Sequence, residues 1–350
     1  MSEISSINPL DRYSRQTLFA PIGISGQAKL QSATVAIVGV GATGAAMAAL
    51  LARAGVGTLT LIDRDFVEPS NLQRQVLFTE ADAINSLPKA EAARCHIKEF
   101  NSEVVVHPHV ADLTPTNIHS LLQDADLVLD ATDNFETRYL LNDYAVQQSK
   151  PWIYTAAVGS YAATMNILPT ALNGADRTAC LTCLFPKPPS GAVETCDTAG
   201  ILCTAVNFAA SLCVTETMKL LTGNHADLRR TLLSYDLWTG ERSEIRSEKP
   251  RLGCITCGLH EYPHLEGKGR AAITLCGRNS VQIHERNRPL DLAALAQRLQ
   301  VHGVVRHNTM LLRLHLPQHT LTVFADGRAL IQGTTDPALA RSIYSRYIGS

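Results

Sequence analysis

Three glycines and an aspartate are spaced so that they could bind the phosphate and the ribose of a nucleotide. Gly39, Gly41 and Gly44 have G-x-G-x-x-G spacing and separate an apolar run, residues 35–38, from an Ala-rich segment of helical length. A second apolar run ends in Asp63, 19 positions after Gly44 (63 minus 44). Strand, glycine turn, helix, strand and acid make a βαβ unit that binds phosphate at the helix N-terminus and ribose at the carboxylate. The motif does not distinguish one nucleotide from another, and a glycine-rich turn in an ordinary βαβ unit is the alternative.

A dense polar cluster follows the strand that ends in Asp63, and it comprises Ser70, Asn71, Gln73, Arg74 and Gln75. Such a cluster lies beyond the carboxyl ends of the strands, where ligands bind in parallel sheets. The planar guanidinium of Arg74 could hold a phosphate through two parallel hydrogen bonds. We therefore expect a ligand at this edge of the sheet.

Three further cations could serve an anionic ligand or could lie in water. Lys89 stands in the first turn of a helix that Pro88 is predicted to open at its first position. A lysine there opposes the helix dipole, which indicates an anion partner, and a solvated surface lysine is the alternative. Arg12 and Arg15 flank Tyr13 in R-Y-S-R-Q and share one helical face, but the motif alone favours a solvated basic turn.

An acidic residue follows the predicted buried strand 126–130, D-L-V-L-D. The strand runs into A-T-D-N, so Asp133 stands at the carboxyl end of a strand. This position suits a Mg²⁺ ion that is bound together with phosphates. The alternative is that Asp133 or Asn134 caps the following helix, which is predicted to run through Val146, and the two roles are compatible.

Four cysteines form two C-x-x-C pairs. Cys180 and Cys183 lie in C-L-T-C, and Cys254 and Cys257 lie in C-I-T-C. Two such pairs predict a structural zinc site, because each loop offers two thiolates to one tetrahedral ion. The pairs are 71 positions apart (254 minus 183), so the ion would hold a distant tail against the domain. A redox-active C-x-x-C is the alternative, but neither pair has a thioredoxin-like βαβ context.

A fifth cysteine has a different setting. Cys196 lies in a loop rich in glycine, proline, serine and threonine, before a long apolar helix predicted over residues 201–221. The dipole of a nearby helix N-terminus favours a thiolate, whereas Asp197 opposes it locally. Cys203 and Cys213 lie on the helix itself and are predicted to be buried small hydrophobic residues.

The elements that must position these residues alternate between strand and helix up to residue 168. This alternation predicts an α/β fold with a doubly wound, Rossmann-like and mainly parallel sheet. The two cysteine pairs add a structural zinc site to this fold. From Ala271 the pattern changes to short strands, two helices and a hairpin that turns at Asp326-Gly327. We therefore predict a nucleotide-binding domain over residues 11–258, a linker over 259–270 and a small C-terminal α+β module over 271–350.

Composition limits the class of protein. The 350 residues are 45% hydrophobic and carry a net charge of −1, so no broad basic surface indicates nucleic acid as a partner. The first ten residues have neither a basic start nor an apolar core, and no apolar run reaches the length of a membrane span. Nine cysteines without a secretory signal indicate a reducing compartment, so we expect a cytoplasmic protein.

The motifs, taken together, resemble one family. In chain order they are R-Y-S-R-Q, G-V-G-A-T-G, D-R-D, S-N-L-Q-R-Q, P-K-A, A-T-D-N-F-E-T-R, C-x-x-C, C-D-T-A-G and C-x-x-C. This pattern, over roughly residues 11–258, resembles the ThiF/MoeB/HesA group, the bacterial relatives of the ubiquitin-activating enzymes. The C-terminal module, with L-C-G-R-N-S-V-Q-I and D-G-R-A-L-I-Q-G-T-T-D, resembles the tail of the Bacillus-type branch that serves thiazole synthesis.

The resemblance implies an ATP-dependent nucleotidyltransferase that adenylates the C-terminal glycine of a small ubiquitin-like sulfur carrier protein. It implies that Asp63 binds the ribose, that Arg74 and Lys89 contact phosphates and that Asp133 holds Mg²⁺. The rest of the nucleotide site would consist of Gly39, Gly41, Ala42, Gly44, Ser70, Asn71, Leu72, Gln73 and Asn134. At Ala42 many members have glycine, but only a backbone N–H is needed there.

Two further roles follow from the resemblance alone. Arg15 would act as an arginine finger in the site of a partner subunit, which makes the enzyme a homodimer. Cys196 matches a thiol that takes part in sulfur or acyl transfer, with a donor such as a cysteine desulfurase.

The carrier, which ends in Gly-Gly, is expected to be ThiS-like and to serve thiamin thiazole synthesis, and a MoaD-like carrier for molybdenum cofactor is the alternative. An NAD-dependent oxidoreductase would explain only the glycine motif and Asp63. A non-catalytic zinc-containing adaptor would leave the predicted ATP residues without a purpose.

Overall fold

The computed structural model describes residues 9–172, 176–187, 199–267, 274–275, 280–283, 290–307, 311–325 and 327–349. The chain divides into two compact units. The first consists of Met1–Val193 with Ile201–Lys268, and the second consists mainly of Gly269–Ser350.

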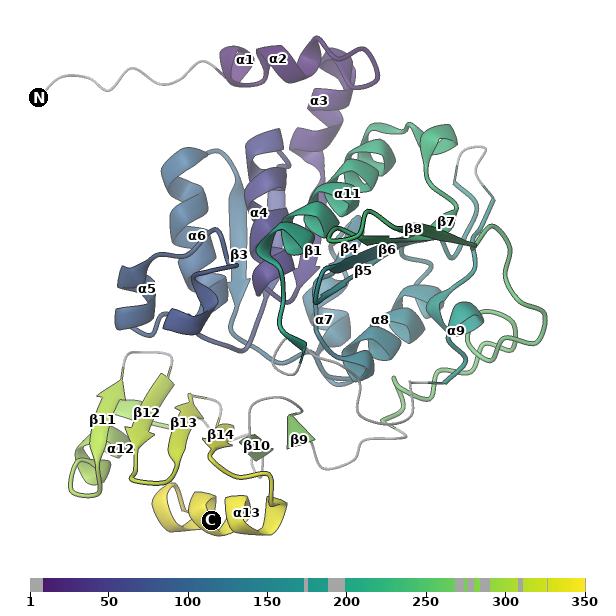
Figure 1. Cartoon of the computed structure of the whole chain (residues 1–350). Helices are drawn as coiled ribbons and strands as arrows, with labels where there is room; N and C mark the ends of the chain where they lie inside the picture. The colour runs from purple at the N-terminus through teal and green to yellow at the C-terminus, as the bar shows by residue number, and fades with distance from the viewer. Residues whose placement is uncertain are drawn as a thin grey trace, which may run out of the picture. The chain divides into compact units, whose positions relative to one another are not determined.

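The first unit is built on an eight-stranded sheet with the order β3-β2-β1-β4-β5-β6-β7-β8 (Figure 1). The strands are β1 (Thr34–Val38), β2 (Thr58–Ile62), β3 (Val105–His109), β4 (Leu127–Asp130), β5 (Trp152–Val158), β6 (Tyr161–Ile167), β7 (Thr231–Asp236) and β8 (Arg242–Arg246). The strands from β3 to β5 in this order are parallel, and those from β5 to β8 are antiparallel. The predicted Rossmann-like, mainly parallel sheet is confirmed.

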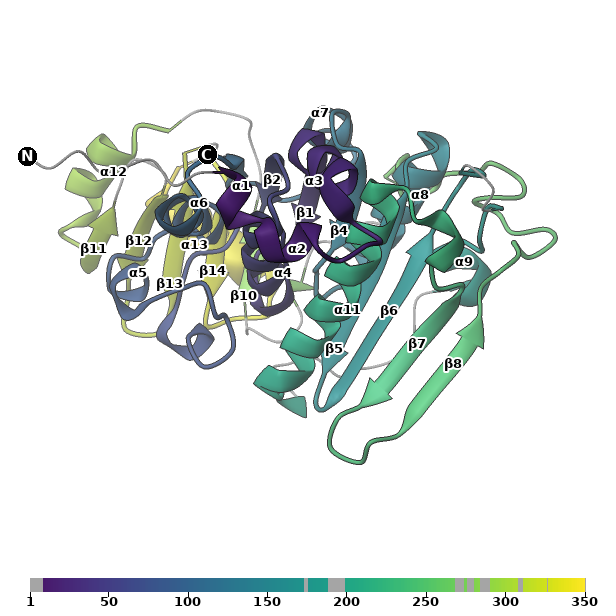
Figure 2. The same cartoon turned by 90° about the horizontal axis from the view of Figure 1, so that it is seen from above.

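Helices cover both faces of this sheet, as the view from above shows (Figure 2). One face carries α3 (Gly23–Ser32), α4 (Ala42–Ala54), α6 (Lys89–Phe100) and α11 (Cys203–Thr222). The other carries α7 (Ile118–Leu122), α8 (Phe135–Gln147) and α9 (Leu181–Leu184). The remaining short helices are α1 (Pro9–Arg12), α2 (Ser14–Thr17), η1 (Pro69–Asn71), α5 (Glu80–Ile84) and η2 (His225–Asp227).

Strand β1 shows why the run from Val35 to Val38 contains no polar residue. Val35 and Ile37 belong to the hydrophobic cluster beneath α4 and α11, whereas Ala36 and Val38 belong to the cluster beneath α8. Successive side chains of a strand point to opposite faces, so a strand covered on both faces has no polar side. None of the described helices, including the 20-residue α11, is long and apolar enough to cross a membrane.

The loops after β1 and β4 meet where the strand order reverses, which is the place where sheets of this kind bind ligands. Gly39 has a φ of +88°, and a Cβ there would lie 2.7 Å from the carbonyl oxygen of Ala131. A Cβ on Gly44 would lie 1.9 Å from the carbonyl oxygen of Gly39. Both positions therefore require glycine, for conformation in one case and for close approach in the other.

Residues 259–267, the described part of the predicted linker, do not form a free linker. Tyr262 and Leu265 pack against the hydrophobic cluster of α8, and the ring of His264 stacks on Tyr139 with 5.1 Å between centroids. The backbone N–H of His264 also donates to Asp143 Oδ2 at 2.9 Å. The segment was predicted to be a linker because most of its residues are polar, but its few apolar side chains attach it to the first unit.

The second unit is an antiparallel six-stranded sheet with the order β11-β12-β13-β14-β10-β9. Its elements are β9 (Thr274–Leu275), β10 (Ser280–Ile283), α12 (Leu292–Leu299), β11 (Val304–His307), β12 (Leu311–His315), β13 (Thr320–Phe324), β14 (Ala329–Gln332) and α13 (Pro337–Tyr347). Asp291 and Asp336 cap the two helices. The predicted small α+β module is confirmed, and its hairpin joins β13 to β14, but β9 and β11 were not predicted.

Candidate nucleotide site and cysteine cluster

The structure brings Asp63 against the glycine loop. Its Oδ2 accepts the backbone N–H of Val40 at 2.6 Å, and its Oδ1 accepts the N–H of Asp65 at 2.7 Å. Burial raises the pKa of Asp63 above its usual range, although the charge of Lys89 acts in the opposite direction. Each carboxylate oxygen has a second lone pair, so Asp63 can hold the loop and still accept a hydroxyl group.

The glycine loop ends at the N-terminus of α4. Gly41 is the N-cap of this helix and Ala42 is its first residue. The first N–H groups of a helix have no partner within the helix, and they attract an anion. The predicted phosphate position therefore coincides with the start of a 13-residue helix.

Lys89 is not a solvated surface residue. Its side chain is 3% exposed, and its Nζ lies 3.2 Å from Asp65 Oδ2. The helix begins at Lys89, and Pro88 is its N-cap rather than its first residue. The Lys89 N–H donates to the carbonyl oxygen of Asp65 at 2.9 Å, which holds the start of α6 beside the loop after β2.

The polar cluster after β2 lies over the glycine loop. Gln75 is buried, and its Nε2 would be 4.0 Å from a Cβ on Gly41. The Oε1 of Gln75 is also buried and has no hydrogen-bond partner among the described residues. Arg74 Nη1 donates to the carbonyl oxygen of Ser70 at 2.8 Å. Gln75 is thus the member of the cluster whose side chain lies beside Gly41, although it was not among the predicted nucleotide-binding residues.

Of the other members of the predicted cluster, some are buried in the fold and some are exposed to solvent. Asn71 is buried and its Oδ1 accepts the N–H of Glu68 at 3.1 Å. Leu72 is half-buried and packs against the core beneath α4. Ser70 and Gln73 are exposed.

Asn134, and not Asp133, is the N-cap of α8. The Oδ1 of Asn134 accepts the N–H of Thr137 at 2.8 Å. Asp133 is exposed and forms no hydrogen bond or ion pair with any residue in the described ranges. Its carboxylate is therefore left for a cation or for solvent. The predicted cap is present, and of its two candidate residues Asn134 forms it.

A buried ion pair that the sequence analysis missed shapes the loop before Asp133. Arg138 Nε lies 3.1 Å from Asp130 Oδ2, and Arg138 Nη2 donates to the carbonyl oxygen of Thr132 at 2.6 Å. The Thr132 N–H donates to Asp130 Oδ1 at 2.9 Å. Burial is the largest influence and lowers the pKa of Arg138, but the charges of Asp130, Tyr154 and Asp133 and the hydrogen bond to Asp130 together outweigh it, so the net pKa is raised. The available signal was an arginine within the otherwise buried helical run T-R-Y-L-L.

Acidic and basic side chains lie together at the carboxyl ends of the parallel strands. Arg64 Nη1 lies 3.1 Å from Asp112 Oδ2. Burial lowers the pKa of Arg64, whereas Asp112, Asp65 and Asp133 raise it, and the net effect is a raised pKa. A mixed set of this kind can bind an anionic polyphosphate together with a divalent cation.

Arg15 lies near the C-terminal end of α4, at the opposite end of the strands from the glycine loop. Its neighbour Tyr13 is buried, and the Tyr13 hydroxyl accepts a hydrogen bond from Asn101 at the C-terminal end of α6 at 3.0 Å. Gln16 Nε2 donates to the carbonyl oxygen of Ala54, the last residue of α4, at 2.9 Å. Arg15 itself is exposed and bonds to none of the residues that the structure describes. The length of α4, about 20 Å, therefore separates Arg15 from the glycine loop of its own chain.

The four cysteines of the two pairs come together. The sulfur–sulfur distances are 3.7 Å for Cys180–Cys183, 3.6 Å for Cys180–Cys254 and 3.4 Å for Cys183–Cys257. All four Sγ atoms lie within 4.8 Å of one another and none is in a disulfide. A tetrahedral ion with Zn–S bonds of about 2.3 Å needs sulfur atoms about 3.8 Å apart. The donor set fits zinc and could bind it.

The remaining cysteines are less informative. Cys196 lies outside the described residues. Cys213 is buried on α11, and burial raises its pKa to about 12, so the prediction of an inert small hydrophobic residue is confirmed. Cys203 is the first residue of α11 and is only half-buried, because the first turn of the helix is less covered than its middle.

Comparisons with known proteins agree with this arrangement. The sequence pattern of the ThiF family matches residues 13–256. The chain is 47% identical to the sulfur carrier protein ThiS adenylyltransferase of Bacillus subtilis (strain 168), over 97% of this chain and 99% of that protein. It is 38% identical to the sulfur carrier protein adenylyltransferase of Thermus thermophilus, over 71% of this chain and 91% of that protein.

More distant similarities cover the first unit. The chain is 38% identical to the adenylyltransferase and sulfurtransferase MOCS3 of Culex quinquefasciatus, over 71% of this chain and 56% of that protein. The crystal structure of E. coli MccB with ATP is 25% identical, with a TM-score of 0.61 over 71% of this chain and 74% of that one. The match to the family pattern and the identity to its members over most of their length show that the chain belongs to the ThiF family.

Proposed function

We propose that the chain adenylates the C-terminal glycine of a ThiS-like sulfur carrier protein with ATP and releases pyrophosphate, in the synthesis of the thiazole of thiamin. The observation that carries this proposal is the 47% identity to a ThiS adenylyltransferase over nearly the full length of both chains, second unit included. The arrangement of acids and cations at the sheet edge supports the same reaction. Neither a MoaD-like carrier nor an NAD-dependent oxidoreductase is favoured by a comparable observation.

The reaction needs positioned charge more than it needs a base. The attacking carboxylate of the carrier is already ionised at neutral pH. Negative charge develops on the phosphoryl oxygens as the bond to pyrophosphate breaks. We assign Asp63 to the ribose, Arg74 and Lys89 to phosphates, and Asp133 to Mg²⁺. When bound, Mg²⁺ would neutralise phosphate charge beside Asp133.

Arg15 would act in a partner subunit, so the enzyme would be a homodimer. Its exposure and its distance from the glycine loop of its own chain support action in trans. Large apolar side chains nearby are also exposed, namely Leu18 at 74%, Phe19 at 60% and Ile24 at 79%. Exposed apolar groups of this size favour a protein partner, here a second copy of the chain.

The other proposed components follow from the chemistry of the site. Cys180, Cys183, Cys254 and Cys257 would hold a structural Zn²⁺ ion. Cys196 would take part in sulfur or acyl transfer, with a cysteine desulfurase as a sulfur donor. A reduced cysteine cluster of this kind suits the cytoplasm, where we place the enzyme.

Pyrophosphate exchange into ATP tests this function. We expect exchange with Mg²⁺ and a ThiS-type carrier ending in Gly-Gly, less with a MoaD-type carrier, and none with a carrier that lacks its last two residues. Arg74→Ala and Asp133→Ala should each lower the exchange rate at least about 100-fold while the carrier still binds.

Matched controls are Arg94→Ala and Asp124→Ala, which change side chains away from the glycine loop and should stay within about threefold of the wild type. Normal turnover in both site variants would refute the site assignment. A complete lack of exchange with every Gly-Gly carrier would refute the function.

A further inference from the structure

The two cysteine loops share a third residue besides their cysteines. Each pair has the form C-x-T-C, and the threonines are Thr182 and Thr256. Their side chains are almost fully buried, at 2% and 1% exposure, and their hydroxyl oxygens lie 3.1 Å apart. Two polar side chains in the same position of two loops 74 residues apart thus meet beside the cysteine cluster.

Helix α8 supplies a partner for each threonine. Asn142 Nδ2 donates to Thr182 Oγ1 at 3.0 Å, and Thr256 Oγ1 donates to Asp143 Oδ1 at 3.3 Å. Both α8 residues are fully buried. Each hydroxyl has one proton. Thr256 Oγ1 lies within hydrogen-bond distance of both Thr182 Oγ1 and Asp143 Oδ1, so its one proton serves either acceptor, while Thr182 Oγ1 accepts from Asn142.

The same two α8 residues also hold the backbone of the segments that carry the cysteines. Asn142 Oδ1 accepts the N–H of Leu181 at 2.8 Å, and Asp143 Oδ2 accepts the N–H of His264 at 2.9 Å. The polar network thus fastens both cysteine segments to one helix. Its loss would leave buried polar groups unpaired, at a cost of about 1–3 kcal/mol each.

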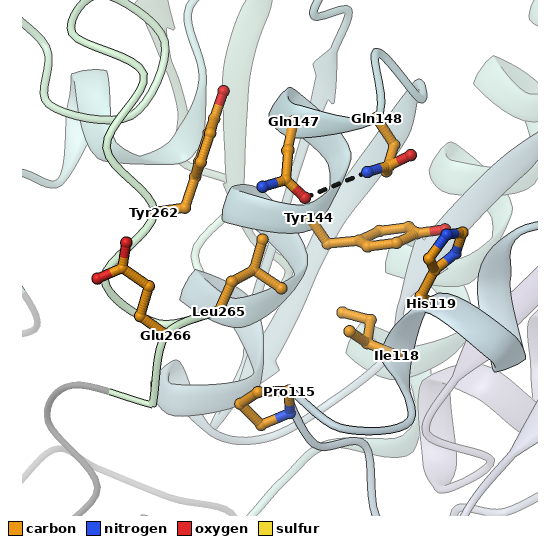
Figure 3. Close-up of a pocket in the computed structure, with 9 residues that line it drawn as sticks. All are labelled: Pro115, Ile118, His119, Tyr144, Gln147, Gln148, Tyr262, Leu265 and Glu266. Carbon is orange, nitrogen blue, oxygen red and sulfur yellow. Dashed lines mark hydrogen bonds between the residues drawn. The ribbon is translucent and has the colours of Figure 1, made fainter.

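The packing of residues 259–267 against α8 is interrupted by a cavity. A cavity of about 320 Å³ lies between the tail, α7 and the C-terminal half of α8. Figure 3 shows Tyr262 and Leu265 of the tail on one side of this cavity and Tyr144 and Gln147 of α8 on another. The hydrogen bond from His264 to Asp143 therefore acts together with the packing of Tyr262 and Leu265 to hold residues 259–267 on α8.

Helix α8 also reaches the candidate nucleotide site. Its first turns carry the Asn134 cap and the Arg138–Asp130 ion pair, which together shape the loop before Asp133. Asn142 lies one helical turn after Arg138. One rigid helix is thus bonded to the cysteine loops in its middle and to the nucleotide loop at its start.

We propose that Thr182 and Thr256 are positioning residues that tie the metal-bearing loops to Asn142 and Asp143 of α8, so that metal in the cysteine cluster fixes the loop of residues 131–134. The proposal rests on the zinc site and the nucleotide site proposed above. Residues that hydrogen-bond to the metal ligands or their loops hold the ligands in position, and their loss typically lowers metal affinity about 10–100-fold. Hydrogen bonds in such a network also strengthen one another.

The first arm of the test measures zinc. Full-length zinc-loaded protein is mixed with the chromophoric chelator 4-(2-pyridylazo)resorcinol, and the rate of zinc release is followed. Thr182→Val and Thr256→Val should each release zinc at least about tenfold faster, and the double variant should release it little faster than either single variant.

Thr217→Val is the matched control. Thr217 is a fully buried threonine on α11 whose hydroxyl donates to the carbonyl oxygen of Cys213 at 2.9 Å. Its release rate should stay within about twofold of the wild type. Thr182→Ser and Thr256→Ser keep the hydroxyl and should restore slow release, which separates lost hydrogen bonds from misfolding.

The second arm measures hydrogen exchange of the amides of residues 131–138, which does not depend on activity. These amides should exchange faster in both valine variants and in the chelator-treated wild type. Unchanged zinc release would overturn the proposal, and so would faster release with unchanged exchange at residues 131–138. If no variant, wild type included, shows pyrophosphate exchange while both arms behave as expected, the proposed function fails and the positioning role stands.

Discussion

The pair formed by Asp130 and Arg138 places two opposite charges in the interior of the first unit. Their side chains are 0% and 7% exposed. A buried pair of this kind adds little net stability relative to apolar residues, because both charges lose their hydration. Its value here is geometric, since Arg138 also holds the carbonyl oxygen of Thr132 and so sets the path of the loop that carries Asp133.

Arg138→Met should destabilise the protein strongly, because it leaves the carboxylate of Asp130 buried without its cation. We expect the free energy of unfolding to fall by about 3–5 kcal/mol, measured by urea unfolding followed by circular dichroism. The double variant Asp130→Asn/Arg138→Met should recover part of this loss. Arg94→Met, which removes a more exposed ion pair with Glu91, should cost less than about 1 kcal/mol. Equal losses for Arg138→Met and Arg94→Met would contradict this account.

For individual residues, the sequence predicts those roles that depend only on spacing along the chain. The four cysteines and the contact of Asp63 with the glycine loop depend on such spacing. The roles of Arg138 and the two threonines could not be predicted, because they depend on which segments meet in the fold. Gln75 was predicted as a member of the polar cluster, but its place beside Gly41 was not. Only the geometry of the helix cap shows that Asn134, and not Asp133, is the capping residue.

Helix α5 shows how one acid can join two elements. Asp82 Oδ2 accepts the N–H of the N-cap Thr79 at 2.7 Å, and it lies 2.7 Å from His96 Nε2 on α6. Burial raises the pKa of Asp82, but the hydrogen bonds from Thr79 and His96 outweigh it, and the net pKa is lowered. An aspartate with a lowered pKa in the folded state stabilises the fold while it is ionised.

This cap predicts a dependence of stability on pH. The contribution of Asp82 should be fully present above the ordinary aspartate pKa of about 3.9 and should be lost as the pH falls through the lower pKa of the folded state. Asp82→Asn should therefore lower the free energy of unfolding by about 1–2 kcal/mol at pH 7. The difference from the wild type should shrink below about pH 3.5. Urea unfolding at a series of pH values measures it, and a difference that grows with acidity would contradict the assignment.

Most strands and helices could be predicted from runs of apolar residues, but their ends could not. The prediction failed for β11, where most side chains are exposed and no alternation of apolar and polar residues is present. It also failed for residues 259–267, where Tyr262 and Leu265 attach a polar segment to α8. Both cases depend on tertiary contacts that local composition does not reveal.

The two units have separate cores at the scale of the whole molecule. The first has clusters on both faces of its sheet, and the second has its own cluster beneath α12 and α13. The Thermus thermophilus relative matches 71% of this chain over 91% of its own length, so a chain of about the first unit's extent exists. Separate cores of this size are expected to fold independently.

Truncation after Lys268 should therefore leave a folded first unit. We expect a single cooperative urea transition and pyrophosphate exchange within about fivefold of the full chain. The full chain should show an additional transition from the second unit, visible by circular dichroism. An unfolded or inactive truncated chain would mean that the second unit is needed for the first to fold or act.

The cysteine cluster also has a consequence for the order of events during synthesis. Cys180 and Cys254 are 74 residues apart, and the second pair comes later in the chain. At a translation rate of about 5–20 residues per second, the first pair waits roughly 4–15 s for its partners. During that interval the nascent chain carries two unpaired thiols of an incomplete site. Completion of the first unit therefore has to wait until residue 257 has left the ribosome, when most of the second unit has yet to be made.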